Sequence, residues 1–230
     1  NATLTCTNTS AVFTASGGGT YLWSSGGNNN TVTVTTPNTY AVTVTDGTNG
    51  CTATASAVVN QDITAPVAGV TPATATLTCT ANSTTLTASG GGTYSWSNGT
   101  NTAAITVSAP NTYTVTVTNP ANGCTATASA VVNQNITPPA VSVTPTSAVL
   151  NCAAQSATLT ASGGDTFVWS NGDNTAVITV SLPNTYTVTA TDITNGCTAT
   201  AAATVTQTAV PPVATINPGA FTLTCTTTST

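Results

Sequence analysis

Residues 112–118 read Thr-Tyr-Thr-Val-Thr-Val-Thr, and this alternation decides the fold. Successive side chains of a β-strand point to opposite faces, so Tyr113, Val115 and Val117 share one face and the Thr side chains share the other. One apolar and one polar face are typical of an antiparallel strand that covers a core on one side only.

Similar short runs flank this strand, and Gly-rich, Asn-Gly and Pro-Asn pairs supply the turns between them. No segment has the periodicity of a helix. Six or seven short strands at this spacing predict an all-β fold, an antiparallel β-sandwich. The other predicted strands are 67–79, 84–89, 93–97, 103–108 and 124–132.

Internal repetition is the second organising feature of the chain. The step is 73 residues, because 79 minus 6, 124 minus 51, 96 minus 23 and 113 minus 40 all equal 73. Tandem copies of one supersecondary unit are the usual cause of such a period. The recurring residues are Cys6, Cys79, Cys152 and Cys225; Cys51, Cys124 and Cys197; Trp23, Trp96 and Trp169; and Tyr40, Tyr113 and Tyr186.

The period divides the chain into tandem β-sandwich repeats. Repeat 1 covers residues 1–64, repeat 2 covers 65–137 and repeat 3 covers 138–210, while 211–230 form the first strand of an incomplete fourth repeat. A unit of 73 residues is small for a self-supporting core, so a covalent staple is expected.

The cysteines are the candidates for that staple, with one disulfide in each repeat. Four predicted strands separate the two cysteines of a repeat, and an even number of up-and-down strands returns the chain to the same end of a sandwich. This predicts the bonds Cys6–Cys51, Cys79–Cys124 and Cys152–Cys197. The alternative, Cys51 with Cys79 across the linker, must span two strands, whereas bonded Cα atoms lie within about 7 Å.

The composition excludes several classes of function. The chain has no Lys, Arg or His, and its five acidic residues are all Asp. Most general acids and bases are therefore missing, so we expect no enzyme and no cofactor. Nucleic-acid binding relies on cations that this chain lacks. No apolar run approaches the roughly 20 residues that span a bilayer, so no membrane insertion by this segment is expected.

Three motifs resemble a known family. Residues 90–99 are Gly-Gly-Gly-Thr-Tyr-Ser-Trp-Ser-Asn-Gly, 110–117 are Pro-Asn-Thr-Tyr-Thr-Val-Thr-Val, and 122–128 are Asn-Gly-Cys-Thr-Ala-Thr-Ala. Together they resemble the PKD-like and Ig-like tandem repeats of large secreted Bacteroidetes surface proteins, the SprB-type adhesin repeats among them. The resemblance implies an Ig-like fold, display at the cell surface and no catalytic residues.

Two kinds of residue have a functional and a structural interpretation. Trp23, Trp96 and Trp169 would stack on sugars if exposed, but their alternation with neighbouring aromatic residues favours the core, together with Tyr40, Tyr113 and Tyr186. Asp46 and Asp192 precede Gly-Cys turns and would suit calcium, yet single Asp residues in turns usually bond their own backbone. We therefore predict no metal site.

The sequence thus predicts a structural stalk or filament of a secreted, extracellular or cell-surface protein. The alternative is an adhesin module that binds glycans or surfaces. The expected partners are neighbouring repeats or copies of the chain in a filament, and glycans under the alternative.

The last residues hold an unmatched cysteine. Residues 220–230 repeat the register of 1–11, because 220 minus 1 is three periods of 73. The partner of Cys225 is expected 45 residues later, beyond residue 230, so Cys225 is unpaired here or bonds between units. Either the segment is a window on a longer array, or this strand completes a neighbouring subunit at repeat 1.

Overall fold

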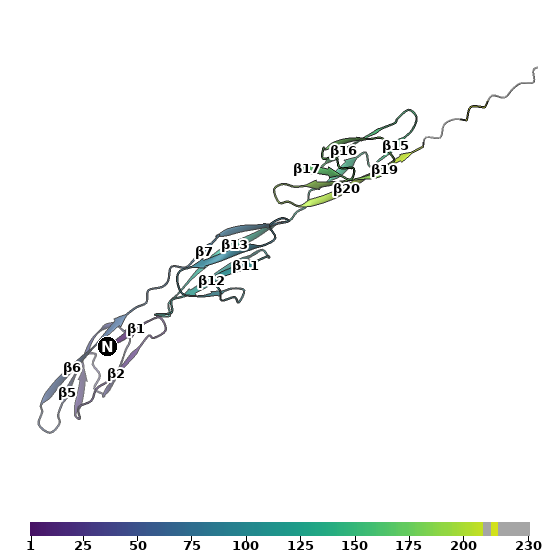
Figure 1. The fold of residues 1–230 in the computed structure, drawn as a ribbon. Helices are drawn as coiled ribbons and strands as arrows, with labels where there is room; N and C mark the ends of the chain where they lie inside the picture. Colours follow the sequence, from purple (N-terminus) through teal and green to yellow (C-terminus); the bar gives the residue numbers. More distant parts are fainter. Residues whose placement is uncertain (209–212, 216–230) are drawn as a thin grey trace, which may run out of the picture. The chain divides into compact units, whose positions relative to one another are not determined.

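The computed structural model describes residues 1–208 and 213–215, and all regular secondary structure among them is β-strand. Residues Asn1–Ile136 form one compact unit, and a second begins at Thr137 (Figure 1). Over the described part of the chain, no helix is long and apolar enough to cross a membrane. The expected fourth-repeat strand with Cys225 lies outside the described residues, apart from 213–215.

Repeat 2 is a sandwich of two sheets. The larger sheet has the order β10-β12-β13-β8 and the smaller has the order β11-β9-β7. All their pairings are antiparallel except that of β8 with β13, which is parallel. The strands are β7 (Gly69–Thr71), β8 (Thr74–Thr78), β9 (Thr84–Ser89), β10 (Thr93–Trp96), β11 (Ala104–Val107), β12 (Asn111–Thr118) and β13 (Thr125–Asn135).

The core of repeat 2 follows from the alternation of apolar residues. In β12, Val115 and Val117 are fully buried and Tyr113 is nearly so, while the Thr side chains alternate with them. They pack with Leu86 of β9 and other apolar residues of both sheets. The predicted all-β, Ig-like sandwich is therefore confirmed. The predicted strand 67–79 is two strands, because Pro72 lies between β7 and β8 and has no N–H for a ladder.

Repeat 3 has the same arrangement in the second unit. Its sheets have the orders β15-β20-β19-β17 and β14-β16-β18, and β15 pairs parallel with β20. Val188 and Leu159 are fully buried in its core. The strands are β14 (Ser142–Thr144), β15 (Ser147–Leu150), β16 (Ala157–Ser162), β17 (Thr166–Trp169), β18 (Val177–Val180), β19 (Asn184–Thr191) and β20 (Thr198–Gln207).

Repeat 1 has the same sandwich with one strand fewer. Its larger sheet has the order β1-β6-β5-β3, but the smaller sheet contains only β2 and β4. No counterpart of β7 or β14 stands beside β2 among the described residues. The strands are β1 (Ala2–Leu4), β2 (Ala11–Thr14), β3 (Thr20–Trp23), β4 (Thr31–Val34), β5 (Asn38–Thr45) and β6 (Thr52–Gln61).

Candidate functional site at the joint between repeats

The turn before the last strand of repeat 2 has a compact, hydrogen-bonded form. The Asn119 N–H donates to the Cys124 carbonyl at 2.8 Å, and the Gly123 N–H donates to the Asn119 carbonyl at 2.8 Å. Gly123 has φ +70°, a conformation in which glycine has no steric penalty. The turn places Asn122 and Cys124 at one end of the sandwich, where the linker from repeat 1 arrives.

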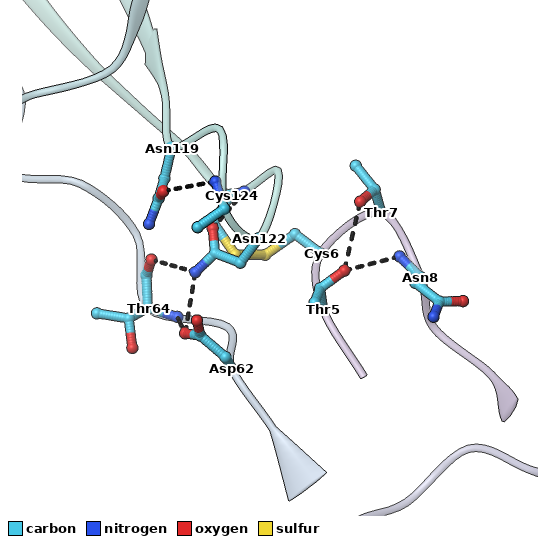
Figure 2. The surroundings of a disulfide bond; sticks show 10 residues. Thr5, Cys6, Thr7, Asn8, Asp62, Thr64, Asn119, Asn122 and Cys124 are labelled. Carbon is cyan, nitrogen blue, oxygen red and sulfur yellow. Dashed lines mark hydrogen bonds between the residues drawn. A yellow bond between two sulfur atoms is a disulfide. The ribbon is translucent and has the colours of Figure 1, made fainter. Parts of the chain in front are cut away.

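A disulfide at this turn joins repeat 2 to repeat 1. Cys124 is bonded to Cys6, with their Cα atoms 5.0 Å apart and 118 residues between them in sequence. Figure 2 shows the bond between the loop after β1 and the turn before β13. The Cys6 N–H also donates to the Asn122 carbonyl at 3.1 Å.

Asn122 is the polar centre of the joint. Its side chain is only 2% exposed. Its Nδ2 donates to Oδ1 of Asp62 at 2.9 Å and to the Thr64 carbonyl at 3.0 Å, while its Oδ1 accepts the Cys124 N–H at 2.9 Å (Figure 2). Buried polar groups need such partners, and this side chain connects the turn of repeat 2 to the linker of repeat 1.

Gly123 brings the two repeats into close contact. A Cβ atom added to Gly123 would overlap the side chain of Thr7, in the loop that carries Cys6. The turn therefore contacts the loop of repeat 1 through backbone on one side and a Thr side chain on the other. The joint thus combines a disulfide, hydrogen bonds and close packing.

The predicted pairing of cysteines within each repeat is wrong. Cys6 is bonded to Cys124 rather than to Cys51, so Cys79–Cys124 does not form, and Cys51 and Cys152 are exposed free thiols, so Cys152–Cys197 does not form either. The alternative bond between Cys51 and Cys79 is excluded by the same free thiol. Cys79 and Cys197 are disulfide-bonded.

The parallel pairing of β8 with β13 explains this correction. Thr78, next to Cys79, lies opposite Asn135 at the far end of β13, whereas Cys124 precedes the first residue of that strand. The 11 residues of β13 extend over about 36 Å, far more than a disulfide can span. The two cysteines of one repeat therefore lie at opposite ends of the sandwich.

The same turn recurs before the last strand of repeat 3. Asn195 and Cys197 are 2% and 1% exposed. Asn195 Nδ2 donates to the Thr137 carbonyl at 2.9 Å, and its Oδ1 accepts the Cys197 N–H at 2.8 Å. The amide in this turn thus binds the residues that lead into the repeat in both places.

The candidate aromatic and acidic residues have structural roles. Trp23, Trp96 and Trp169 are 5%, 3% and 2% exposed. The indole N–H of each donates to a backbone carbonyl at 2.9 Å. The hydroxyls of Tyr40, Tyr113 and Tyr186 likewise donate to backbone carbonyls at 3.0 Å, and all three rings are buried.

The Asp side chains of the turns bond their own backbone. Oδ1 of Asp46 accepts the Thr48 N–H at 2.8 Å, and Oδ1 of Asp192 accepts the Thr194 N–H at 2.8 Å. Bonds from the hydroxyl and N–H of Thr48 hold the pKa of Asp46 below its ordinary value. Within residues 1–208 and 213–215, no group of three or more His, Cys, Asp or Glu side chains is placed to hold a metal ion.

Sequence reasoning missed Asn122 and Asp62 as residues of the joint. A signal was present, because Asn49, Asn122 and Asn195 stand two residues before the second cysteine of each repeat. Their partners are invisible in the sequence, since Asp62 lies 60 residues before Asn122.

Comparison with known proteins adds little. No protein-family description matches the sequence, and no curated protein matches it. Among solved structures, the four N-terminal Ig domains of Dscam1 isoform 9.44 are 13% identical over 86% of this chain, with TM-score 0.29, and the chain spans 65% of that structure's length. Three N-terminal domains of the bacteriophage RB49 outer capsid protein Hoc are 16% identical, over 82% of this chain and 88% of theirs, with TM-score 0.34.

Replacing Asn122 with Ala is expected to weaken the first unit. The change removes the side-chain bonds to Asp62 and Thr64 and leaves the Cys124 N–H buried without its acceptor. An unsatisfied buried group costs about 1–3 kcal/mol, which urea unfolding followed by tryptophan fluorescence measures. Asn49→Ala is the matched control, because Asn49 is exposed in the equivalent turn. Equal losses in the two variants would contradict the role given to Asn122.

Acid is expected to loosen the joint through Asp62. The amide of Asn122, and then the Thr64 N–H, hold the pKa of Asp62 below its ordinary value. A lowered pKa in the folded state means that this contribution to stability is complete above the unfolded pKa of about 4 and is lost as pH falls through the folded value. Urea midpoints at a series of pH values should therefore decrease less for Asp62→Asn than for the native chain. Parallel profiles would show that Asp62 does not contribute.

Proposed function

We propose that this chain is a non-catalytic structural segment, a stalk or filament of an extracellular or cell-surface repeat protein. The observation that carries the proposal is the Cys6–Cys124 bond, which joins one repeat to the next rather than closing a single repeat. A bond between successive folded domains restrains their joint, whereas a bond within one domain stabilises that domain alone. The resemblance of the sequence to tandem surface repeats agrees with this role.

The composition supports the same proposal. The chain has no Lys, Arg or His, so proteases that cut after Lys or Arg have no site. Disulfides persist in oxidising compartments, which supports a location outside the cytosol. The buried tryptophans leave no aromatic platform for sugar at those positions, so the stalk is preferred over a glycan-binding module.

Small-angle scattering of the oxidised chain tests the proposal. Strands of this length, with turns and a Pro-containing linker, predict a rod with about 30 to 40 Å per repeat. The maximum dimension should stay constant as salt rises, because no charged pair sets the geometry of the joint. A compact particle, with the maximum dimension of a single globule of this mass, would contradict the structural role.

A further inference from the structure

The free end of repeat 1 has the same turn as the joint, with no neighbouring repeat on it. The Asp46 N–H donates to the Cys51 carbonyl at 2.9 Å, and the Gly50 N–H donates to the Asp46 carbonyl at 2.8 Å. Asn49 Oδ1 accepts the Cys51 N–H at 2.8 Å, as Asn122 does for Cys124. These bonds orient the Asn49 amide and the Cys51 thiol before anything docks.

Exposure distinguishes the two turns. Asn49 and Cys51 are exposed and Cys51 is a free thiol, whereas Asn122 and Cys124 are almost fully buried. A Cβ added to Gly50 would contact nothing, whereas one added to Gly123 would overlap Thr7. The turn of repeat 1 is therefore half of a joint.

A groove of about 510 Å³ in repeat 1 continues this surface. It is lined by Cys51, by Trp23 and Val44, and by residues 14–17 after the end of β2. Val44 is half-buried there, although its counterpart Val117 is fully buried in repeat 2. The groove thus exposes part of the apolar core.

Repeat 2 shows what fills this place. There β7 pairs with β9 through Gly69 with Ser89, Val70 with Ala88, and Thr71 with Thr87, and Val70 packs on the core. Subtracting 73 from 87–89 gives 14–16, which line the groove. Repeat 1 therefore has an open sheet edge shaped for a short strand of the β7 kind.

We propose that this face of repeat 1 docks a further repeat of the same type, which supplies a β7-like strand, a linker carbonyl and a first-cysteine turn. The strand would fill the groove, the carbonyl would accept from Asn49 Nδ2, and the turn would bring a thiol to Cys51. Repeat 1 and its linker supply these parts to repeat 2 through β7, Thr64 and Cys6. The proposal deepens the structural function above and rests on it.

Repeat 3 carries the matching donor. Cys152 is a free, exposed thiol that follows β15 as Cys6 follows β1. Its turn has the same form, because the Ala154 N–H donates to Asn151 Oδ1 at 2.8 Å and the Asn8 N–H donates to Thr5 Oγ1 at 3.0 Å. With an acceptor on repeat 1 and a donor on repeat 3, copies of the chain join head to tail, an arrangement that propagates.

The covalent step is a thiol–disulfide exchange with a small-molecule disulfide such as glutathione disulfide. The Cys152 thiolate first attacks the reagent, which releases one glutathione thiol and leaves a mixed disulfide. The Cys51 thiolate then attacks the Cys152 sulfur and releases the second glutathione. The two protein thiols lose two electrons and one proton each, and one glutathione disulfide is reduced to two thiols.

The test uses the full chain in a glutathione redox buffer, with non-reducing electrophoresis and mass spectrometry of the linked peptides. Random oxidation gives the Cys51–Cys152 link only twice as often as either symmetric link. Docking predicts a ladder of oligomers in which that mixed link exceeds each symmetric one by at least about tenfold, since docked thiols react at a high effective concentration. A chain that stays monomeric, or one with statistical links, would overturn the proposal.

Two further measurements separate docking from simple thiol chemistry. Asn49→Asp keeps the acceptor for the Cys51 N–H but removes the amide donor, so the mixed link should decrease several-fold, whereas exposed Asn28→Asp should leave it unchanged. An excess of a peptide with the sequence of residues 66–72 should suppress the ladder, and a scrambled peptide should not. No effect of either change would overturn the proposal. A chain that is extended in scattering but monomeric here would overturn docking and leave the structural function intact.

Discussion

A single oxidised chain pulled from its two ends is expected to stop extending at least about 390 Å short of the same chain after reduction. The Cys6–Cys124 bond carries the load past the 118-residue separation between these cysteines, and an extended chain covers about 3.3–3.6 Å per residue. Most of repeats 1 and 2 is therefore shielded from force while the bond is intact. Optical-tweezers extension curves with and without reductant measure the difference.

The Cys51→Ser/Cys152→Ser double variant is the matched control for this experiment. Both thiols are free, so the variant should keep the full difference between the oxidised and reduced lengths. If each repeat closed its own disulfide, this variant would retain only the Cys79–Cys124 loop of 45 residues, since 124 minus 79 is 45. A difference that shrinks to about 150 Å would therefore contradict the bond between repeats.

Removing the bond with Cys6→Ala and Cys124→Ala is expected to lower the free energy of unfolding of the first unit by on the order of 5 kcal/mol. The chain-entropy description of disulfides gives this magnitude for a loop of more than about 100 residues, because the unfolded chain regains that freedom. Repeat 1 should lose its structure first, since its core cluster contains only five buried residues. Urea unfolding, followed by tryptophan fluorescence under oxidising conditions, measures the change.

The control for this stability experiment replaces the free cysteines instead. Cys51→Ala and Cys152→Ala change exposed residues without a bond, so their effect should stay within about 0.5 kcal/mol. Equal losses in the two double variants would mean that the bond does not stabilise the unit.

Local features of the fold were predictable from the sequence, and long-range ones were not. The alternation in residues 112–118 predicts β12 and its buried face, because side-chain direction depends only on local strand geometry. The error over the cysteines has a non-local cause. Counting strands assumes that each strand reverses the chain, whereas β8 runs parallel to β13, and nothing near Thr78 or Asn135 indicates that pairing.

The joint shows the same limit. The recurrence of Asn122 every 73 residues marks it as important, but not whether it binds its own repeat or the one before. Its partners Asp62 and Thr64 are separated from it by a whole sandwich in the sequence. The groove of repeat 1 is visible only when its sheet edge is compared with that of repeat 2, where β7 occupies the equivalent place.

Mapping the disulfides of the oxidised chain tests the bond between repeats most directly. Digestion with chymotrypsin after alkylation of free thiols separates the peptides that hold Cys6, Cys51 and Cys124, and mass spectrometry identifies the linked pairs. The account predicts a peptide that joins Cys6 to Cys124, with Cys51 and Cys152 alkylated. A peptide that joins Cys6 to Cys51 would contradict it.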